Sequence, residues 1–429
     1  MSLTVARGLF GIVVLIFIAW LLSSDRRHFP WKVVLVGLGL QWLLALLVLK
    51  TGPGHVVFDA FGSLVTVVLA GADQGAKFVF GPLAGNDPAV AWQAIAGIKI
   101  MASIIVVAAI SALAYHYGIL QRVVSAVAWV MRQAMGVSGA ESLPCGAGGF
   151  LGQTEAPLLV RPYISRMTRS EVMAMMTTGF AHIAAGVMAV YVFMMGGEDP
   201  ARRVLIARHL LTASLMAGPG ALVMAKILVP ERDTPLTSGK TPVVLERETS
   251  SLLDALTRGA SQGMTLSINV IAMLVAFIAL IAILDTALAA FGHVSFVAPA
   301  LARIGIERLD LNSILGLLFS PVAWILGVDG SDSRMFGSVL GKAMATNEFL
   351  AYGSLSEIAR NGGMSERSTI MAVYCICNFA NFSSIGIQIG GIGAIAPDRR
   401  ADLVSLGPRA MLAGAMASWM TGCIAGVLL

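Results

Sequence analysis

The chain has 429 residues, of which 57% are hydrophobic and only 12% are charged, and its mean hydropathy is +0.82. This composition lies outside the range of water-soluble globular proteins and indicates a chain that crosses a lipid bilayer several times. The formal net charge of +5 does not indicate nucleic-acid binding, because the basic residues are dispersed at the ends of apolar segments and form no basic stripe with interleaved aromatic residues.

Apolar segments long enough to cross a hydrocarbon core, about 20 helical residues each, occur along the whole chain. The first is expected to be a retained span rather than a signal peptide, because it is long and is not followed by a clear cleavage signal. Two further segments are interrupted by polar residues, so that about eight crossings are predicted in total. The uninterrupted segments are Val5–Leu22, Trp31–Leu49, Ala91–Tyr115, Val204–Leu228, Gly263–Leu288 and Ala410–Leu429, and the interrupted ones are Val172–Met195 and Thr369–Ile395.

Basic residues gather in three of the connecting loops. The positive-inside bias predicts that these loops are cytoplasmic, so that the parity of the spans places both chain termini outside. Arg202 and Arg203 lie on the other side in this arrangement and argue against it. The three loops contain Arg26, Arg27 and Lys32; Arg161, Arg166 and Arg169; and Arg399 and Arg400.

An internal repeat is visible on either side of a hydrophilic stretch near the midpoint, VPERDTPLTSGKTPVVLERE. This stretch is predicted to be a cytoplasmic linker, at 229–250. In residues 119–228 and again in residues 296–429, an Arg-bearing amphipathic helix at the membrane interface precedes a short small-residue segment, a polar tip, an amphipathic return and two spans. The sequence therefore predicts two structural repeats.

Each polar tip carries a carboxylate, Glu155 in GQTEAP and Glu348 in TNEF. The flanking segments have only about 10 to 12 apolar residues and are too short to cross alone, so each tip is expected to be the turn of a re-entrant helical hairpin, around 140–167 and 333–361. The predicted fold is an all-α polytopic membrane protein with about eight transmembrane helices plus two re-entrant hairpins in two inverted repeats.

A carboxylate inside a membrane is costly unless it is paired or used, and two such tips in corresponding positions of two repeats are typical of secondary transporters. Three other interpretations of these glutamates are compatible with the sequence. Each glutamate could be a protonated structural residue; the chain could be a channel, although a channel does not explain paired hairpins; or Glu155 and His182 could belong to an intramembrane enzyme. The sequence has no HExxH or GxSxG motif, so no enzyme is predicted.

Four stretches of the sequence resemble the concentrative nucleoside transporters, and the resemblance extends from about Phe78 to the C-terminus. It implies a homotrimer in a bacterial plasma membrane. The N-terminal spans within 1–118, with a periplasmic connection, and the span within 251–295 would form a scaffold, past which the hairpins and their partner spans move nucleosides as an elevator. The stretches are GQTEAPLLVRPY (152–163), TTGFAHIAAGVMAVY (177–191), NEFLAY (347–352) and CNFANFSSIGIQIGGIGAIAPDRRADL (377–403).

The resemblance also implies roles for individual residues at a nucleoside site. Uridine and other pyrimidine nucleosides are favoured as substrates, and adenosine remains possible. Gln153 and Thr154 would hydrogen-bond the nucleobase, with Glu155 beside them and Val187 and Phe379 packing against the substrate, and Glu348, Asn381 and Ser384 would bind the ribose hydroxyls.

The coupling cation is where the chain departs from the sodium-coupled members that it resembles. Two side-chain ligands of their sodium site are replaced here by Gly148 and His182, and only backbone carbonyls of Gly148, Leu151, His182 and Ile183 remain. Histidine is a poor ligand for a hard cation but takes up a proton near neutral pH. Proton coupling through His182 is therefore predicted, with Glu155 or Glu348 as the alternative proton carrier and sodium binding through carbonyls as the alternative ion. No other cofactor is expected.

Overall fold

The computed structural model describes residues 3–85, 96–197, 199–238, 249–294, 298–303, 306 and 308–429. Within these ranges the chain is helical and has no β-strand. Three short 3₁₀ helices connect the α-helices: η1 (Gly81–Ala84), η2 (Ala156–Val160) and η3 (Pro397–Arg399). The α-helices are α1 (Leu3–Leu21), α2 (Trp31–Lys50), α3 (Gly52–Phe80), α4 (Ala96–His116), α5 (Ile119–Met135), α6 (Gly139–Ala147), α7 (Arg161–Ile164), α8 (Arg169–Ala181), α9 (Ala185–Gly196), α10 (Pro200–Leu228), α11 (Leu252–Gly292), α12 (Ala298–Arg303), α13 (Leu311–Ile325), α14 (Ser333–Ala345), α15 (Glu348–Arg360), α16 (Glu366–Cys375), α17 (Phe382–Ile395) and α18 (Arg400–Leu428).

Among the described residues, 8 helical segments are long and apolar enough to cross a membrane. The number agrees with the prediction, but the set does not. The segment Gly52–Ala84, which includes α3, belongs to it and was not predicted, whereas Thr369–Ile395 is divided between the short helices α16 and α17. Part of the predicted segment Ala91–Tyr115 lies outside the described residues.

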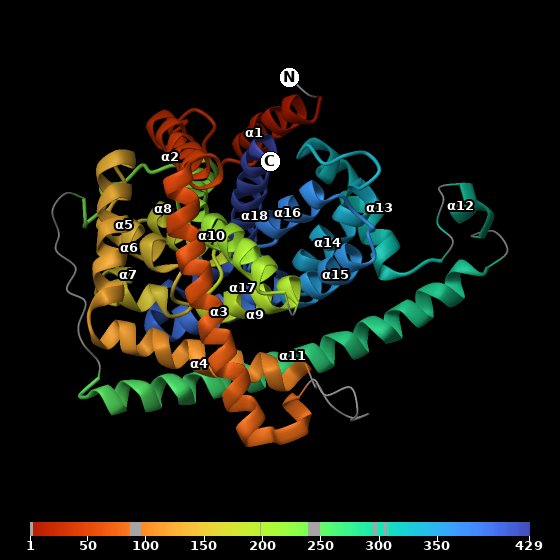
Figure 1. Ribbon diagram of the computed structural model, residues 1–429. Coiled ribbons are helices and arrows are strands. Elements are labelled where there is room, and N and C mark those ends of the chain that lie inside the picture. The colour runs from red at the N-terminus through yellow and green to blue at the C-terminus, as the bar shows by residue number, and fades with distance from the viewer. Residues whose placement is uncertain are drawn as a thin grey trace.

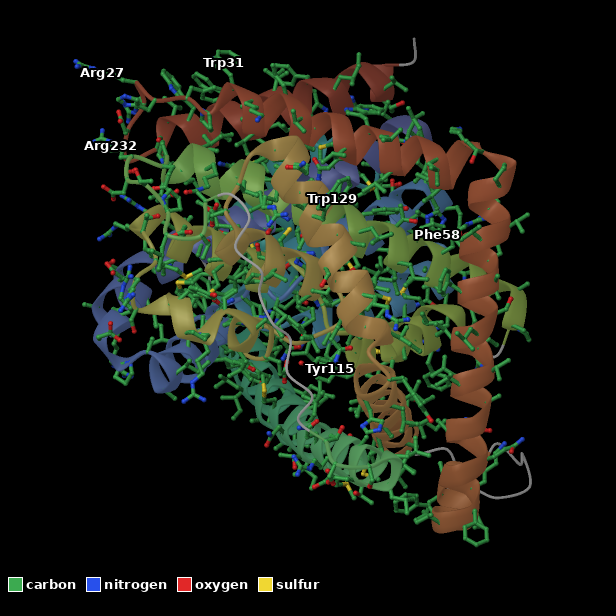
Figure 2. The ribbon with its side chains drawn as sticks, turned by 90° about the vertical axis from the view of Figure 1, so that its left-hand side faces the viewer. Arg27, Trp31, Phe58, Tyr115, Trp129 and Arg232 are labelled. Atoms are coloured by element: carbon green, nitrogen blue, oxygen red, sulfur yellow. The ribbon has the colours of Figure 1, made fainter. Side chains whose placement is uncertain are left out.

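Helix α3 lies across one end of the bundle instead of spanning it. Asp59 pairs with Arg208 near the start of α10 at 3.2 Å, and Asp73 approaches Lys99 at the start of α4 at 4.0 Å, so both halves of α3 stay near the beginnings of other helices. Figure 2 shows α3, marked by Phe58, turning away from the end of α2 and descending along one edge of the molecule. Without α3, and with α8–α9 and α16–α17 each counted as one interrupted span, the part of the chain that the structure describes contains eight membrane-crossing segments.

The two ends of the bundle can be identified from contacts between chain segments. At the end that we call the terminal face, a Cβ added to Gly8 in α1 would lie 2.9 Å from Val427 in α18, so both chain termini lie there, as Figure 1 also shows. At the opposite end, the basic face, Asp25 forms an ion pair with Arg232, and Arg169 lies 3.4 Å from Asp402. All three loops with clustered basic residues therefore lie at the same end.

The two hairpins open at opposite ends of the bundle. Hairpin 1, from α6 through η2 and α7, opens at the basic face, where the Ser138 hydroxyl donates to Glu171 of α8 at 2.5 Å. Hairpin 2, from α14 to α15, opens at the terminal face, where the Ser365 hydroxyl donates to Asp332 at 2.7 Å. The return arm of hairpin 1 is a 3₁₀ helix and a single α-helical turn, because Pro157 and Pro162 lie near the starts of these pieces and remove the N–H groups that a longer helix needs.

Two groups of helices pack closely among themselves. Helix α11 has 41 residues and runs beside α4 along one edge of the molecule (Figure 1), where Cβ atoms on Gly259 and Gly263 would lie only 2.7 Å from α4 atoms. Helices α1 and α2 instead pack on α10 and α18, and the buried Gln41 side chain donates to the Met216 carbonyl oxygen at 2.9 Å. Small residues permit such close approach between membrane helices.

Candidate functional site

A cavity of about 190 Å³ lies where the two hairpin tips meet the breaks in α8–α9 and α16–α17. It contains all the residues that the sequence predicts for substrate binding: Gln153, Thr154, Glu155, Val187, Glu348, Phe379, Asn381 and Ser384. Its lining also includes residues that the sequence analysis missed, namely Gly152, Ala184, Leu266, Val270, Met273, Leu274, Asn347, Phe349, Ser383 and Ile387.

The tip of hairpin 1 is an irregular turn between α6 and η2. Helix α6 ends at Ala147, and Pro157 at the start of η2 prevents a regular helix from continuing through the tip. The Glu155 side chain is exposed, and it faces the cavity. The Gln153 side chain donates from Nε2 to the Ser384 hydroxyl oxygen at 3.3 Å, which connects this tip to α17. The tip therefore presents an amide, a hydroxyl and a carboxylate to one space.

The tip of hairpin 2 is a helix start. Asn347 caps α15 because its side-chain oxygen accepts from the Leu350 backbone N–H at 3.0 Å, and this places Glu348 in the first helical turn. The Glu348 side chain is 5% exposed, and its Oε2 accepts from the Asn381 side chain at 3.0 Å. Behind it, the rings of Tyr191 and Tyr352 stack with centroids 4.0 Å apart. The carboxylate is thus held by the Asn381 amide.

The break between α16 and α17 is stabilised by asparagine side chains. Asn378 donates to the Cys375 carbonyl at 2.8 Å and accepts from the Ala380 N–H at 2.9 Å, while Asn381 accepts from the Ser384 N–H at 2.9 Å and so caps α17. These bonds satisfy backbone groups that a continuous helix would pair internally. The same side chains therefore create the break and orient the polar groups at it.

The breaks of the two repeats lie against each other. Helix α8 ends at Ala181 and α9 begins at Ala185, and the Phe379 N–H of the second break donates to the Phe180 carbonyl of the first at 2.8 Å. Val187 and Phe379 line the cavity, and the long helix α11 supplies apolar residues to the opposite wall, including Met273. The cavity has polar groups at its tips and an apolar wall.

The residues predicted for cation coupling lie beside this cavity and do not line it. His182 and Gly148 are in direct contact: a Cβ on Gly148 would lie 2.7 Å from Nδ1 and 2.9 Å from Cγ of the imidazole. The ring is 3% exposed, and its Nδ1 lies 2.8 Å from the Thr178 carbonyl oxygen. Ile183 is fully buried, and Leu151 packs against the core. The imidazole thus occupies the space that a side chain at position 148 would take.

Two broken spans and two hairpins of opposite orientation surround one cavity with polar groups at its tips, an arrangement that is typical of secondary membrane transporters. Family models match nearly the whole chain: "Na+ dependent nucleoside transporter C-terminus" over residues 209–426, the corresponding N-terminus over residues 10–83, and "Nucleoside recognition" over residues 97–198. The chain belongs to the concentrative nucleoside transporter family, as its sequence motifs predict.

Known proteins resemble this chain over nearly its whole length. Solute carrier family 28 member 3 of Mus musculus is 37% identical over 97% of this chain, which spans only 58% of that longer protein. An uncharacterized transporter of Haemophilus influenzae is 37% identical, with 100% of this chain and 98% of the relative covered. The structure titled CNTnw in an inward-facing substrate-bound state has a TM-score of 0.89 and 33% identity and covers 99% of this chain and 98% of its own. The protein is a multi-pass protein of a bacterial plasma membrane, and its relatives are transporters, not enzymes.

Proposed function

We propose that the protein imports nucleosides by symport with a cation. The observation that carries this proposal is the single cavity in which all eight side chains expected to contact a nucleoside come together, although they belong to four separate segments of the chain. Uridine and other pyrimidine nucleosides are the favoured substrates in this proposal, and adenosine is a further candidate substrate.

The ribose is proposed to bind at the tip of hairpin 2. A carboxylate can accept from two neighbouring hydroxyls, and ribose offers such a vicinal pair. Glu348 supplies the carboxylate, and the Asn381 amide, 3.0 Å from it, holds it in place. Ser384 lies one helical turn from Asn381 on α17 and adds a hydroxyl at the same end of the cavity.

The nucleobase is proposed to bind at the tip of hairpin 1. Gln153 and Thr154 present hydrogen-bonding groups there, with Glu155 beside them, and Val187 and Phe379 provide apolar surface for the ring. Under this assignment, Gln153→Ala should change preference among bases more than preference between ribose and 2′-deoxyribose. A larger effect on the sugar would mean that the two tips have been exchanged.

The coupling ion is proposed to be a proton, with His182 as the leading site. The contact between His182 and Gly148 supports this, because the imidazole fills the position where sodium-coupled relatives are expected to have ligands and ion. The Thr178 carbonyl can only accept, so the hydrogen of the neutral ring is on Nδ1, and Nε2 is the nitrogen that can take up a proton. Glu155 and Glu348 are the alternative carriers, and sodium held by backbone carbonyls is the alternative ion.

The moving and fixed parts are proposed to follow the packing of the helices. The pair α4 and α11 is the scaffold that would join subunits of a homotrimer, while the hairpins and broken spans form the part that moves as an elevator. The tight contacts of α1 and α2 with α10 and α18 favour assigning α1 and α2 to the moving part rather than to the scaffold expected for residues 1–118.

Uptake into proteoliposomes tests both substrate and ion. The unmodified protein and His182→Thr are loaded into vesicles, and labelled uridine uptake is measured under an inward proton gradient or an inward sodium gradient at constant pH. Accumulation driven by protons in the unmodified protein and lost in His182→Thr is expected. Accumulation driven by sodium at constant pH, with no response to protons, would overturn proton coupling, and absence of counterflow of labelled against unlabelled nucleoside would overturn the carrier function.

A further inference from the structure

A buried amide behind the cavity donates a hydrogen bond to Gln153. Gln388 lies on α17, one turn beyond Ser384, is 0% exposed and does not line the cavity. Its Nε2 donates to two oxygens, the backbone carbonyl of Met176 at 3.2 Å and the side-chain Oε1 of Gln153 at 3.2 Å. Gln388 therefore contacts the substrate-binding tip from behind.

One backbone group determines the direction of the hydrogen bonds that link Gln388, Gln153 and Ser384. The Met176 carbonyl can only accept, so the NH₂ group of Gln388 must face it, and the second hydrogen of that NH₂ is directed to Gln153. Gln153 must then receive this bond on Oε1. Its own NH₂ group is left to face Ser384, 3.3 Å away, and the cavity.

The Gln388 amide and the Cβ atom of Gln153 both lie close to the backbone of Gly179. A Cβ on Gly179 would lie 2.8 Å from the Gln388 Nε2 and 3.3 Å from the Gln153 Cβ, so both side chains pack directly against that backbone. The Oε1 atom of Gln388 is buried without a hydrogen-bond partner. A methionine would fill the same volume without burying an unpaired oxygen, so the value of an amide at position 388 lies in its donor side.

We propose that Gln388 is a positioning residue for base recognition. By fixing the Gln153 amide with its N–H toward the cavity, it makes the site prefer nucleosides whose base presents a carbonyl oxygen there over nucleosides that present an amino group. Uridine is then preferred to cytidine, and inosine to adenosine. This inference rests on the proposed nucleoside transport and adds the chemical rule by which the site distinguishes bases.

The test replaces Gln388 by a residue that should reverse the orientation of the Gln153 side-chain amide. In Gln388→Glu, the carboxyl group has at most one O–H, which donates to the Met176 carbonyl oxygen, so the other carboxyl oxygen can only accept from Gln153. The Gln153 amide should rotate and present its oxygen to the cavity. We measure inhibition of labelled uridine exchange by unlabelled uridine, cytidine, inosine and adenosine in proteoliposomes, and compare ratios within each variant, which cancel differences in the amount of folded protein.

The unmodified protein should favour the oxo nucleoside of each pair, and Gln388→Glu should shift both ratios toward the amino nucleoside by about tenfold or more. Gln388→Met, which neither donates nor accepts, should bring both ratios close to one. Exchange with unchanged ratios in Gln388→Glu would overturn this inference alone, whereas absence of nucleoside exchange in the unmodified protein would overturn the proposed function as well. If Gln388→Glu does not assemble, Gln388→Met decides, because base ratios unchanged from those of the unmodified protein would show that Gln388 does not orient Gln153.

Discussion

Replacing Gly148 by alanine would drive a methyl group into the ring of His182. The new Cβ would lie 2.7, 2.9 and 3.2 Å from Nδ1, Cγ and Cε1, where ordinary contacts are 3.4–4 Å. The ring is only 3% exposed, so it cannot move away from the methyl group without disturbing the atoms packed around it. Overpacking of this kind costs about 1–3 kcal/mol, and loss of the bond to the Thr178 carbonyl adds about 1 kcal/mol.

Gly148→Ala should therefore lower the free energy of unfolding by about 2–4 kcal/mol. His182→Ala removes the ring and should also destabilise, through the cavity that it leaves. In the double variant the methyl group occupies part of the vacated space, so the combined loss should be smaller than the sum by about 1–3 kcal/mol.

Equilibrium unfolding in detergent micelles of the unmodified protein, the two single variants and the double variant measures this coupling. Gly186→Ala is the matched control, since a Cβ there meets nothing within 4 Å, and it should leave the stability unchanged or raise it. Additive losses in the double variant would refute the direct packing of His182 against Gly148, and with it the structural support for a displaced sodium site.

Three further predictions concern carboxylates. Glu348→Gln should reduce ribonucleoside uptake on the order of 100-fold while the protein still assembles in size-exclusion chromatography, and near-normal uptake would contradict the ribose assignment. Lys226→Met should cost about 3–5 kcal/mol because it leaves buried Glu141 without its ion-pair partner; adding Glu141→Gln should recover much of the loss in thermal unfolding, and failure to recover would contradict the pairing. The hydrogen bond from Arg232 holds the pKa of Asp25 down from 3.8 to about 2. Since a lowered carboxylate pKa stabilises above the unfolded value, the stability advantage over Arg232→Gln should be present above pH 3.8 and disappear as pH falls toward about 2, and parallel stability curves would contradict it.

The sequence analysis predicted the number of crossings and the order of the repeats, but it predicted no helix at α3. Hydropathy and length measure how much apolar surface a helix has and contain no information on the direction of its axis. Gly52–Ala84 is as apolar as a span, yet Asp59 and Asp73 hold it beside Arg208 and Lys99 near the terminal face. Only these long-range contacts, which a single sequence does not reveal, distinguish a helix that crosses from one that lies across an end.

The sequence predicted those cavity residues that are polar within an otherwise apolar stretch of the chain. Glu155 and Glu348 are polar tips within apolar stretches, so they stand out. Met273 and Leu274 of α11 are ordinary residues of an apolar helix, and nothing in their local sequence separates a cavity wall from a lipid-facing side. Gln388 is polar in an apolar stretch and was a detectable signal, but its role follows only from its contact with Gln153, 235 positions away in the sequence.

The Asn381 side chain makes two different hydrogen bonds. Its oxygen accepts from the Ser384 N–H and caps α17, while its nitrogen donates to the Glu348 carboxylate. Aspartate would preserve the cap but set a second carboxylate against the first, and serine would preserve the cap but lacks the length to reach Glu348. Keeping both contacts requires an acceptor for the Ser384 N–H and a donor that reaches Glu348 on the same side chain. A substitution at position 381 that keeps the start of α17 therefore still changes how the carboxylate of hairpin 2 is held, so the helix start and the binding site are coupled through one residue.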